Sequence, residues 1–293
     1  MISIIIPTLN EEKYLPLLLD SIRKQDLKEE YELIVADAGS TDNTAVISKR
    51  YGCRITRGGL PAQGRNEGAK ISRGGTLIFL DADVILPDKF LTKILNEFYG
   101  KKYGVASCQL LPIGTDWVPK IIPPPWFLYN IAYNWPASFL QEVFPYGSGL
   151  ILVKKEIHEA IFGFNEDIKL SEDHDYVRRA SKFGQFKFFK AKLPSFIRRY
   201  EKQGILTTNF KYLISNFFDA FGIKTKINRL DYKFETYVPE SVNKKNERNF
   251  IFQLLWGGLC YLVILVTLII WSIIYLLFTP KLIWQKGRKY IVV

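Results

Sequence analysis

One short segment, residues 76–87 (TLIFLDADVILP), constrains the fold of this chain more than any other. Its first five residues form an apolar run typical of a strand buried on both faces, and the run ends abruptly in Asp81 and Asp83. Ligands of open α/β sheets bind at the carboxyl ends of the strands, where two carboxylates can share a hard divalent cation with phosphate oxygens. The same tripeptide also occurs in solvated turns, so its meaning depends on the segments around it.

The N-terminal third of the chain alternates expected strands with expected helices: strands at 3–7 and 31–36, helices at 14–22 and 45–51. This order predicts right-handed crossovers and a mostly parallel α/β sheet, with its polar loops gathered at one edge. Asp37 directly follows the second strand, so it should lie on the same edge of the sheet as Asp81.

Residues 58–72 (GGLPAQGRNEGAKIS) lie between these two aspartates in the sequence. Their glycines and Pro61 predict a loop, with Arg65 and Asn66 just before a helix start, where anions are favoured. Phosphate is the candidate ligand there, and an exposed salt bridge is the competing interpretation of Arg65. The glycine spacing matches neither the P-loop nor the dinucleotide-binding fingerprint.

Four segments, in this order and spacing, resemble the nucleotide-sugar-binding half of family-2 glycosyltransferases of the GT-A fold: SIIIPTLNEE, VADAGSTDNT, GRNEGA and FLDADV. The resemblance covers residues 1–200, the expected catalytic domain, and implies a Rossmann-like, mostly parallel sheet flanked by helices. One position departs from the family pattern. Ala38 stands where the family commonly has a second acid before its Gly-Ser-Thr-Asp loop.

The resemblance also implies roles for individual residues. It implies a nucleotide-sugar donor, with a divalent metal ion, Mg²⁺ or Mn²⁺, as the cofactor. The residues concerned are Pro7, Thr8 and Glu11 for the nucleotide pocket, Asp37 for the base, Arg65 and Asn66 beside the nucleotide, and Asp81 and Asp83 for the ribose and the metal.

A second group of acids follows an expected strand at 147–155. Glu172, Asp173 and Asp175 fall at the start of an expected helix, where carboxylates suit the helix dipole and need no chemical role. The segments GFNE and SEDHDY, however, resemble the family's Gly-Phe-Asp-Glu and Glu-Asp signature. That resemblance implies that Asp173 deprotonates an acceptor hydroxyl, with Glu172 beside it, while the metal stabilises the departing diphosphate.

The remaining polar candidates have weaker support. His158 and His174 are the only histidines, and His174 should point away from Asp173 because neighbours in a helix face different directions. Arg198 and Arg199 fit either a clamp for a diphosphate or acceptor phosphate, or a solvated basic strand. The Gln-x-x-Arg-Trp motif of processive polysaccharide synthases is missing from the sequence, which favours transfer of one sugar per cycle.

The C-terminal third predicts contact with a membrane. Residues 250–278 contain no charge and exceed the roughly 20 residues needed to cross a bilayer core, so a segment at 250–279 should span it once. Residues 206–221 place leucine, isoleucine and phenylalanine on one helical stripe, which is either core or a helix lying in the headgroup plane. Residues 201–249 would then form a basic juxtamembrane region, and 280–293 a short basic tail.

Charge and cysteine content indicate which class of partner the protein binds and on which side of the membrane its catalytic domain lies. Residues 178–233 hold 14 basic and three acidic side chains, so this segment carries the whole net charge of +11. A basic block before a membrane anchor favours an anionic membrane surface, and no recognised nucleic-acid-binding module accompanies it. Three cysteines without metal-like spacing, and an N-terminus without a signal peptide, predict that the catalytic domain stays on the cytoplasmic side of the membrane.

The sequence therefore predicts a membrane-anchored enzyme that transfers a single sugar, with inversion, from a nucleotide-sugar donor to a lipid-linked acceptor. That acceptor is either a polyprenyl phosphate or a lipid-linked saccharide. A nucleotidyltransferase of similar sheet topology is one alternative, although the first strand lacks the glycine-rich, basic phosphate motif that such an enzyme needs. A membrane-tethered sugar-binding protein without activity is the other, and the sequence specifies neither the donor's base and sugar nor the oligomeric state.

Overall fold

The computed structural model describes residues 1–113 and 145–196, together with residues 134, 135, 138, 141, 265, 266, 269, 272 and 273. The described strands are β1 (Ile2–Thr8), β2 (Tyr31–Asp37), β3 (Arg54–Arg57), β4 (Thr76–Leu80), β5 (Val105–Ile113), β6 (Leu150–Lys154) and β7 (Phe186–Phe196). The longer described helices are α1 (Leu15–Arg23), α2 (Thr44–Arg50), α3 (Pro61–Ile71), α4 (Phe90–Gly100), α7 (Lys155–Ala160) and α8 (Glu172–Ala180).

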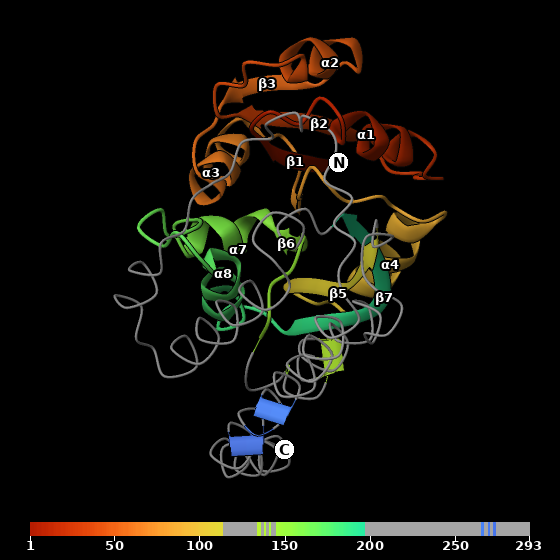
Figure 1. The fold of residues 1–293 in the computed structure, drawn as a ribbon. Helices are drawn as coiled ribbons and strands as arrows, with labels where there is room; N and C mark the ends of the chain where they lie inside the picture. Colours follow the sequence, from red (N-terminus) through yellow and green to blue (C-terminus); the bar gives the residue numbers. More distant parts are fainter. Residues whose placement is uncertain are drawn as a thin grey trace, which may run out of the picture.

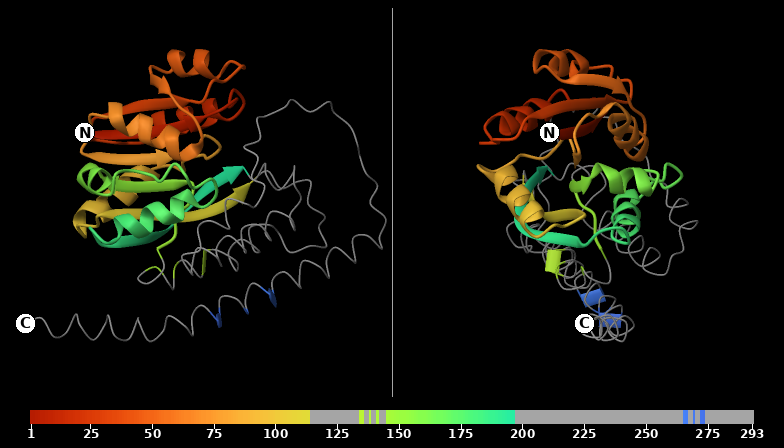
Figure 2. Two further views of the ribbon diagram at one scale, coloured as in Figure 1. Left: turned by 90° about the vertical axis from the view of Figure 1, so that its left-hand side faces the viewer. Right: turned by 180° about the vertical axis from the view of Figure 1, so that it is seen from behind.

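These strands form one sheet in the order β3-β2-β1-β4-β6-β5-β7, with helices packed on both of its faces (Figure 1; Figure 2). Every strand pairing is parallel except the two made by β6, which runs antiparallel to β4 and to β5. The predicted mostly parallel α/β sheet is therefore confirmed. The predicted strand at 76–80 has the expected bounds, and all five of its residues are buried.

Coverage of both faces explains the apolar runs in the central strands. In β1, Ile4 and Ile6 belong to a core cluster shared with α1 and α4, whereas Ile5, between them, belongs to a second cluster shared with α3, α7 and α8. Successive side chains of a strand point to opposite faces. In a strand covered on both sides, all of these side chains are therefore buried, and polar residues do not alternate with apolar ones. Ile4, Ile5 and Ile6 are accordingly fully buried.

The loop predicted for residues 58–72 was wrong, because most of this segment is helix α3. Pro61 opens the helix at a position where a missing backbone N–H does no harm. The helix glycines are there for close packing: a β-carbon on Gly68 would overlap Cγ2 of Ile5, and one on Gly64 would lie 3.1 Å from Cβ of Pro7. Arg65 therefore lies inside a helix that presses on β1, and not before a helix start.

Strand β3 was not predicted from the sequence. Its four residues (RITR) offer a single apolar side chain, and their burial alternates between half-buried and exposed. Such a short, charged strand suits the edge of a sheet, where it discourages pairing with other chains.

Several predictions concern residues outside those that the structure describes. They are the stripe at 206–221, the regions 201–249 and 280–293, and the residues Arg198 and Arg199. In the predicted span at 250–278, the described residues (Leu265, Val266, Ile269, Ser272 and Ile273) are helical with exposed side chains. Among the described residues there is no helix with the length and apolar character required to cross a bilayer.

Candidate active site

The carboxyl ends of β1, β2 and β4 bring the predicted donor-side residues to one edge of the sheet. Thr8 and Asp37 are register partners at the ends of β1 and β2, and Thr8 Oγ1 donates a hydrogen bond to Asp37 Oδ2 at 2.9 Å. Asp81 follows β4, which pairs in parallel with β1 on its other side. The prediction that Asp37 and Asp81 share one edge is confirmed.

The loops after β1 and β2 are tied to each other by hydrogen bonds. The Asp37 carboxylate accepts from the backbone N–H groups of Gly39 and Ser40 and from Ser40 Oγ. Asn10 Oδ1 accepts from the N–H of Thr41, and the N–H of Glu11 donates to Thr44 Oγ1. Asp37 thus orders its own loop, and the loop that carries Asn10 and Glu11 is tied to it by hydrogen bonds.

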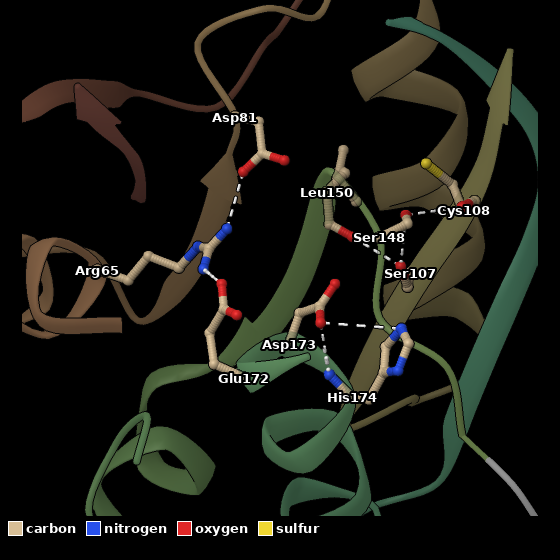
Figure 3. Close-up of polar contacts among 9 residues, drawn as sticks. All are labelled: Arg65, Asp81, Ser107, Cys108, Ser148, Leu150, Glu172, Asp173 and His174. Carbon is tan, nitrogen blue, oxygen red and sulfur yellow. Dashed lines mark hydrogen bonds and ion pairs between the residues drawn. The ribbon is translucent and has the colours of Figure 1, made fainter. Parts of the chain in front are cut away.

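Arg65, on α3, lies between Asp81, which follows β4, and Glu172, which begins α8 (Figure 3). Its Nη2 donates to Asp81 Oδ1 at 2.8 Å and its Nη1 donates to Glu172 Oε1 at 2.8 Å, while the side chain is only 6% exposed. Its guanidinium also lies 5.3 Å from the ring centre of Phe164. Burial alone would lower the pKa of Arg65, but the charges of Asp81 and Glu172 outweigh it and raise the pKa. The exposed-salt-bridge interpretation of Arg65 is therefore excluded.

Glu172 and Asp173 lie in the first turn of α8, as the sequence predicted. Burial raises the pKa of both carboxyl groups. The positive charge of Arg65 opposes this rise in both residues, and the negative charge of Asp81 adds to it in Asp173. A carboxylate whose pKa is raised toward neutrality is better suited to accept a proton from a hydroxyl group than an ordinary aspartate is.

The sequence predicted a strand at 147–155, whereas β6 begins at Leu150, and residues 147–149 (Gly-Ser-Gly) lie between Asp81 and Asp173. Asp81 donates its backbone N–H to the carbonyl of Gly149 at 3.0 Å. A β-carbon on Gly149 would lie 3.3 Å from Asp81 Oδ2, and one on Gly147 would lie 2.7 Å from the backbone of Asp173. Ser148 Oγ turns to the other side, where it donates to the carbonyl of Cys108 at 2.8 Å (Figure 3).

The two histidines have different surroundings. The expectation that His174 points away from Asp173 was wrong: its Nε2 lies 3.8 Å from Asp173 Oδ1, and its ring packs 4.0 Å from the ring of Tyr146. His158 is a core residue whose Nδ1 lies 2.8 Å from the hydroxyl of Tyr176. Burial, with the nearby charges of Lys155 and Arg179, lowers the pKa of His158 to about 4. His158 is therefore neutral at physiological pH.

The turn that carries Asp83 is held by the end of β7. The N–H of Ile85 donates to the carbonyl of Pro194, and the N–H of Phe196 donates to the carbonyl of Asp83, both at 2.9 Å. The chain thus leaves β7 beside the D-x-D turn, two residues before Arg198 in the sequence.

The side chains of the site suit a divalent metal ion in their chemistry. Three carboxylates, those of Asp81, Glu172 and Asp173, act on the single guanidinium of Arg65, so negative charge is in excess there. Hard cations such as Mg²⁺ prefer oxygen ligands of this kind and commonly complete their coordination with substrate phosphates. Within the described residues, no group of three or more His, Cys, Asp or Glu side chains is placed to hold a metal by itself. The excess of carboxylate oxygens is therefore compatible in its chemistry with a divalent metal ion.

Sequence comparison finds relatives among glycosyltransferases. Over 90 residues the chain is 39% identical to the poly(ribitol-phosphate) β-N-acetylglucosaminyltransferase TarS of Staphylococcus aureus, a match that covers 28% of this chain and 16% of TarS. It is 28% identical over 207 residues to an uncharacterized glycosyltransferase of Haemophilus influenzae, covering 66% of each chain. The chain thus spans less than two thirds of the length of either curated relative.

Structural comparison supports the GT-A fold. The mannosyltransferase PcManGT of Pyrobaculum calidifontis, solved with GDP-Man and Mn²⁺, superimposes with a TM-score of 0.58 at 17% identity, covering 100% of this chain and 80% of that one. TarS 1–349 from S. aureus in complex with UDP-GlcNAc gives 0.51 at 23% identity, covering 67% of this chain and 58% of that one. Residues 3–162, more than half of the sequence, match the family described as Glycosyl transferase family 2. This chain therefore belongs to glycosyl transferase family 2.

Proposed function

We propose that this protein transfers a single sugar, with inversion at the anomeric carbon, from a nucleotide-sugar donor to a lipid-linked acceptor at a membrane surface. One observation carries the proposal. Arg65 bridges Asp81, at the end of a donor-side strand, to Glu172, which is adjacent to the raised-pKa carboxylate of Asp173. Family membership and the nucleotide sugars bound in the two structural neighbours support a donor of this class.

The donor half of the site consists of the ends of β1, β2 and β4. The nucleoside would bind to the hydrogen-bonded loops after β1 and β2, through Pro7, Thr8, Glu11 and Asp37. Arg65 would lie near the diphosphate. Asp81 and Asp83 would hold a divalent metal ion, Mg²⁺ or Mn²⁺. Such an ion, when bound, stabilises the negative charge that develops on the leaving diphosphate.

Asp173 performs the acceptor half of the reaction. Its carboxylate takes the proton of an acceptor hydroxyl as the acceptor oxygen forms its bond to the anomeric carbon. The bond from that carbon to the diphosphate oxygen breaks at the same time, and the nucleoside diphosphate leaves with the electron pair. A single displacement of this kind inverts the anomeric configuration. The backbone N–H of His174 donates a hydrogen bond to Asp173 Oδ1 at 2.9 Å, which favours the ionised form of the base.

Two sequence features support the membrane part of the proposal. The uncharged segment at 250–278 has the length of a single membrane span, and residues 178–233 carry the entire net charge of +11. A short anchor with the catalytic domain on the cytoplasmic side gives the enzyme both a cytosolic nucleotide sugar and an acceptor embedded in lipid. Arg198 and Arg199 would then contact the diphosphate or the phosphate of the acceptor.

The test of the proposed function is a panel of UDP- and GDP-sugars incubated with Mn²⁺ and membrane lipid extract, with the lipid read by mass shift. Transfer adds one sugar mass to a lipid and releases nucleoside diphosphate. Release of pyrophosphate from a nucleoside triphosphate would support the nucleotidyltransferase instead. Donor binding without turnover would support the sugar-binding protein.

Asp173→Asn identifies the kind of acceptor. A hydroxyl acceptor needs a base, so this variant should lose about 100-fold or more in kcat. A polyprenyl phosphate is already ionised, so it would react at a near-normal rate in the same variant. Asp167→Asn, in the exposed loop before α8, is the matched control.

Membrane attachment can be tested with a chain that ends at Asn249. We expect it to sediment with vesicles that contain phosphatidylserine, because residues 178–233 are retained, and to be released by high salt, which screens exposed charges beyond about 8 Å. The full chain should stay with the vesicles at high salt. Equal release of both chains would argue against a membrane span at 250–278.

A further inference from the structure

The side chain of Asn66 is directed at one loop. Its Nδ2 donates to the carbonyl of Phe164 at 3.0 Å and to Glu166 Oε1 at 2.8 Å, and its Oδ1 accepts from the N–H of Phe164 at 2.8 Å. Asn66 is 9% exposed. Both amide hydrogens are therefore donated to residues 164–166, which are about 100 positions away in the sequence.

The loop has the local structure that this contact requires. Gly163 has φ +71°, and a β-carbon there would lie 2.5 Å from Asn66 Oδ1. A side chain at position 163 would thus both strain the backbone and displace the amide. The G-F-N-E segment is shaped so that its backbone can approach α3 closely.

Phe164 connects the same loop to α8. Its ring stacks on Tyr176 of that helix, with ring centres 3.8 Å apart and an angle of 11° between the rings. The guanidinium of Arg65 lies over the same ring, 5.3 Å from its centre. The loop held by Asn66 is therefore packed against the helix that presents Glu172 and Asp173.

Arg65 and Asn66, consecutive in α3, thus hold two points of the segment 164–172. Arg65 holds its end through Glu172, and Asn66 holds its beginning through Phe164. We propose that Asn66 is a positioning residue, which fixes Asp173 relative to Asp81 by holding loop 163–166, and that it does not contact the nucleotide. This inference rests on the proposed role of Asp173 as the base. It replaces the position beside the nucleotide that the family resemblance implied for Asn66.

Steady-state kinetics of Asn66→Asp test the positioning role. The substitution keeps the size of the side chain and the acceptor for Phe164, but removes both donated hydrogen bonds and places a carboxylate against Glu166. Misplacement of a catalytic group by about 1 Å can lower a rate about 100-fold, so we expect kcat to fall by about 10- to 100-fold. The KM for the donor that wild type uses best among UDP- and GDP-sugars should change less than about twofold, because donor contacts are intact.

A reciprocal exchange provides the rescue. In Asn66→Asp combined with Glu166→Gln, the amide of the new glutamine can donate to the new aspartate, which restores the bond with donor and acceptor reversed. We expect the double variant to recover part of the lost kcat. Glu166→Gln alone should stay near wild type, because its amide oxygen still accepts from Asn66. Glu67→Gln, the next residue of α3, removes only an ion pair to the exposed Lys70 and is the matched control.

Hydrogen exchange of Asn66→Ala separates this inference from the proposed function, since it needs no turnover. Exchange should rise in residues 163–173 and stay at the wild-type level in β1 and β4. A wild type without transferase activity would overturn the proposed function, but the exchange result would still show whether Asn66 holds loop 163–166. Unchanged exchange in the loop would show that Asn66 does not hold it. A freed loop with normal kcat, or a raised donor KM with normal kcat, would overturn the positioning role.

Discussion

A β-carbon on Gly147 would lie 2.7 Å from both the carbonyl carbon and the carbonyl oxygen of Asp173. The contact is with backbone, so it cannot be relieved by rotating a side chain. Gly147→Ala should therefore push the first turn of α8 away from Asp81. We expect kcat to fall by about 10- to 100-fold, with a loss of about 1–3 kcal/mol in the free energy of unfolding, measured by donor turnover and urea denaturation.

Gly75→Ala is the control for this prediction. A β-carbon at Gly75 meets nothing within 4 Å, and its φ is outside the left-handed region. We expect wild-type turnover and stability for Gly75→Ala. Equal turnover in the two alanine variants would show that the close approach of Gly147 to Asp173 has no role in catalysis.

A second prediction concerns Arg65 and the pH dependence of turnover. Burial raises the pKa of Asp173, and the charge of Arg65 opposes that rise. Arg65→Gln removes the opposing charge, so the pKa of Asp173 should rise further and a smaller fraction of the base should be ionised at a given pH. The ascending limb of the kcat–pH profile should therefore move to higher pH. Arg65→Lys keeps the charge and should move it less; coincident profiles for Arg65→Gln and wild type would contradict this account.

The fold was largely predictable where the signal was local. The apolar run at 76–80 predicted a strand covered on both faces, and the acids at its end indicated the ligand-binding edge. Helix α3 was mispredicted because glycine usually breaks helices, whereas Gly64 and Gly68 serve close packing against β1. Strand β3 was missed because an edge strand needs little apolar content.

The sequence predicted which residues belong to the site better than it predicted which residues contact one another there. Arg65, Asp81, Glu172 and Asp173 were identified, and the structure brings them together. The partner of Asn66 could not be found, because its loop lies about 100 residues away and neither segment has a periodicity that reports the other. A G-x-G pattern at 147–149 was visible, but its meaning depends on backbones that meet only in the folded sheet.

A third prediction concerns the metal ion. If Asp83 helps to hold a divalent cation at the diphosphate, Asp83→Asn should lose about 100-fold or more in turnover, and a chelator should abolish wild-type activity until Mn²⁺ or Mg²⁺ is added back. Asp88→Asn, on an exposed residue of the same connection, should behave as wild type. Full activity of the wild type in excess EDTA would remove the metal from the mechanism.

The last prediction concerns stability in acid and depends on His158. Burial lowers its pKa in the folded protein to about 4, below the ordinary histidine value of about 6.5. Between these values the unfolded chain binds a proton that the folded protein does not, so the free energy of unfolding should fall as pH drops from 6.5 to 4, by on the order of 3 kcal/mol. His158→Asn keeps a polar partner for the hydroxyl of Tyr176 but does not titrate, so its loss over this range should be smaller by that amount. Urea denaturation of both proteins at several pH values measures the difference, which excludes the contributions of carboxylates common to both. Parallel pH curves for the two proteins would show that His158 is protonated equally easily in the folded and unfolded states.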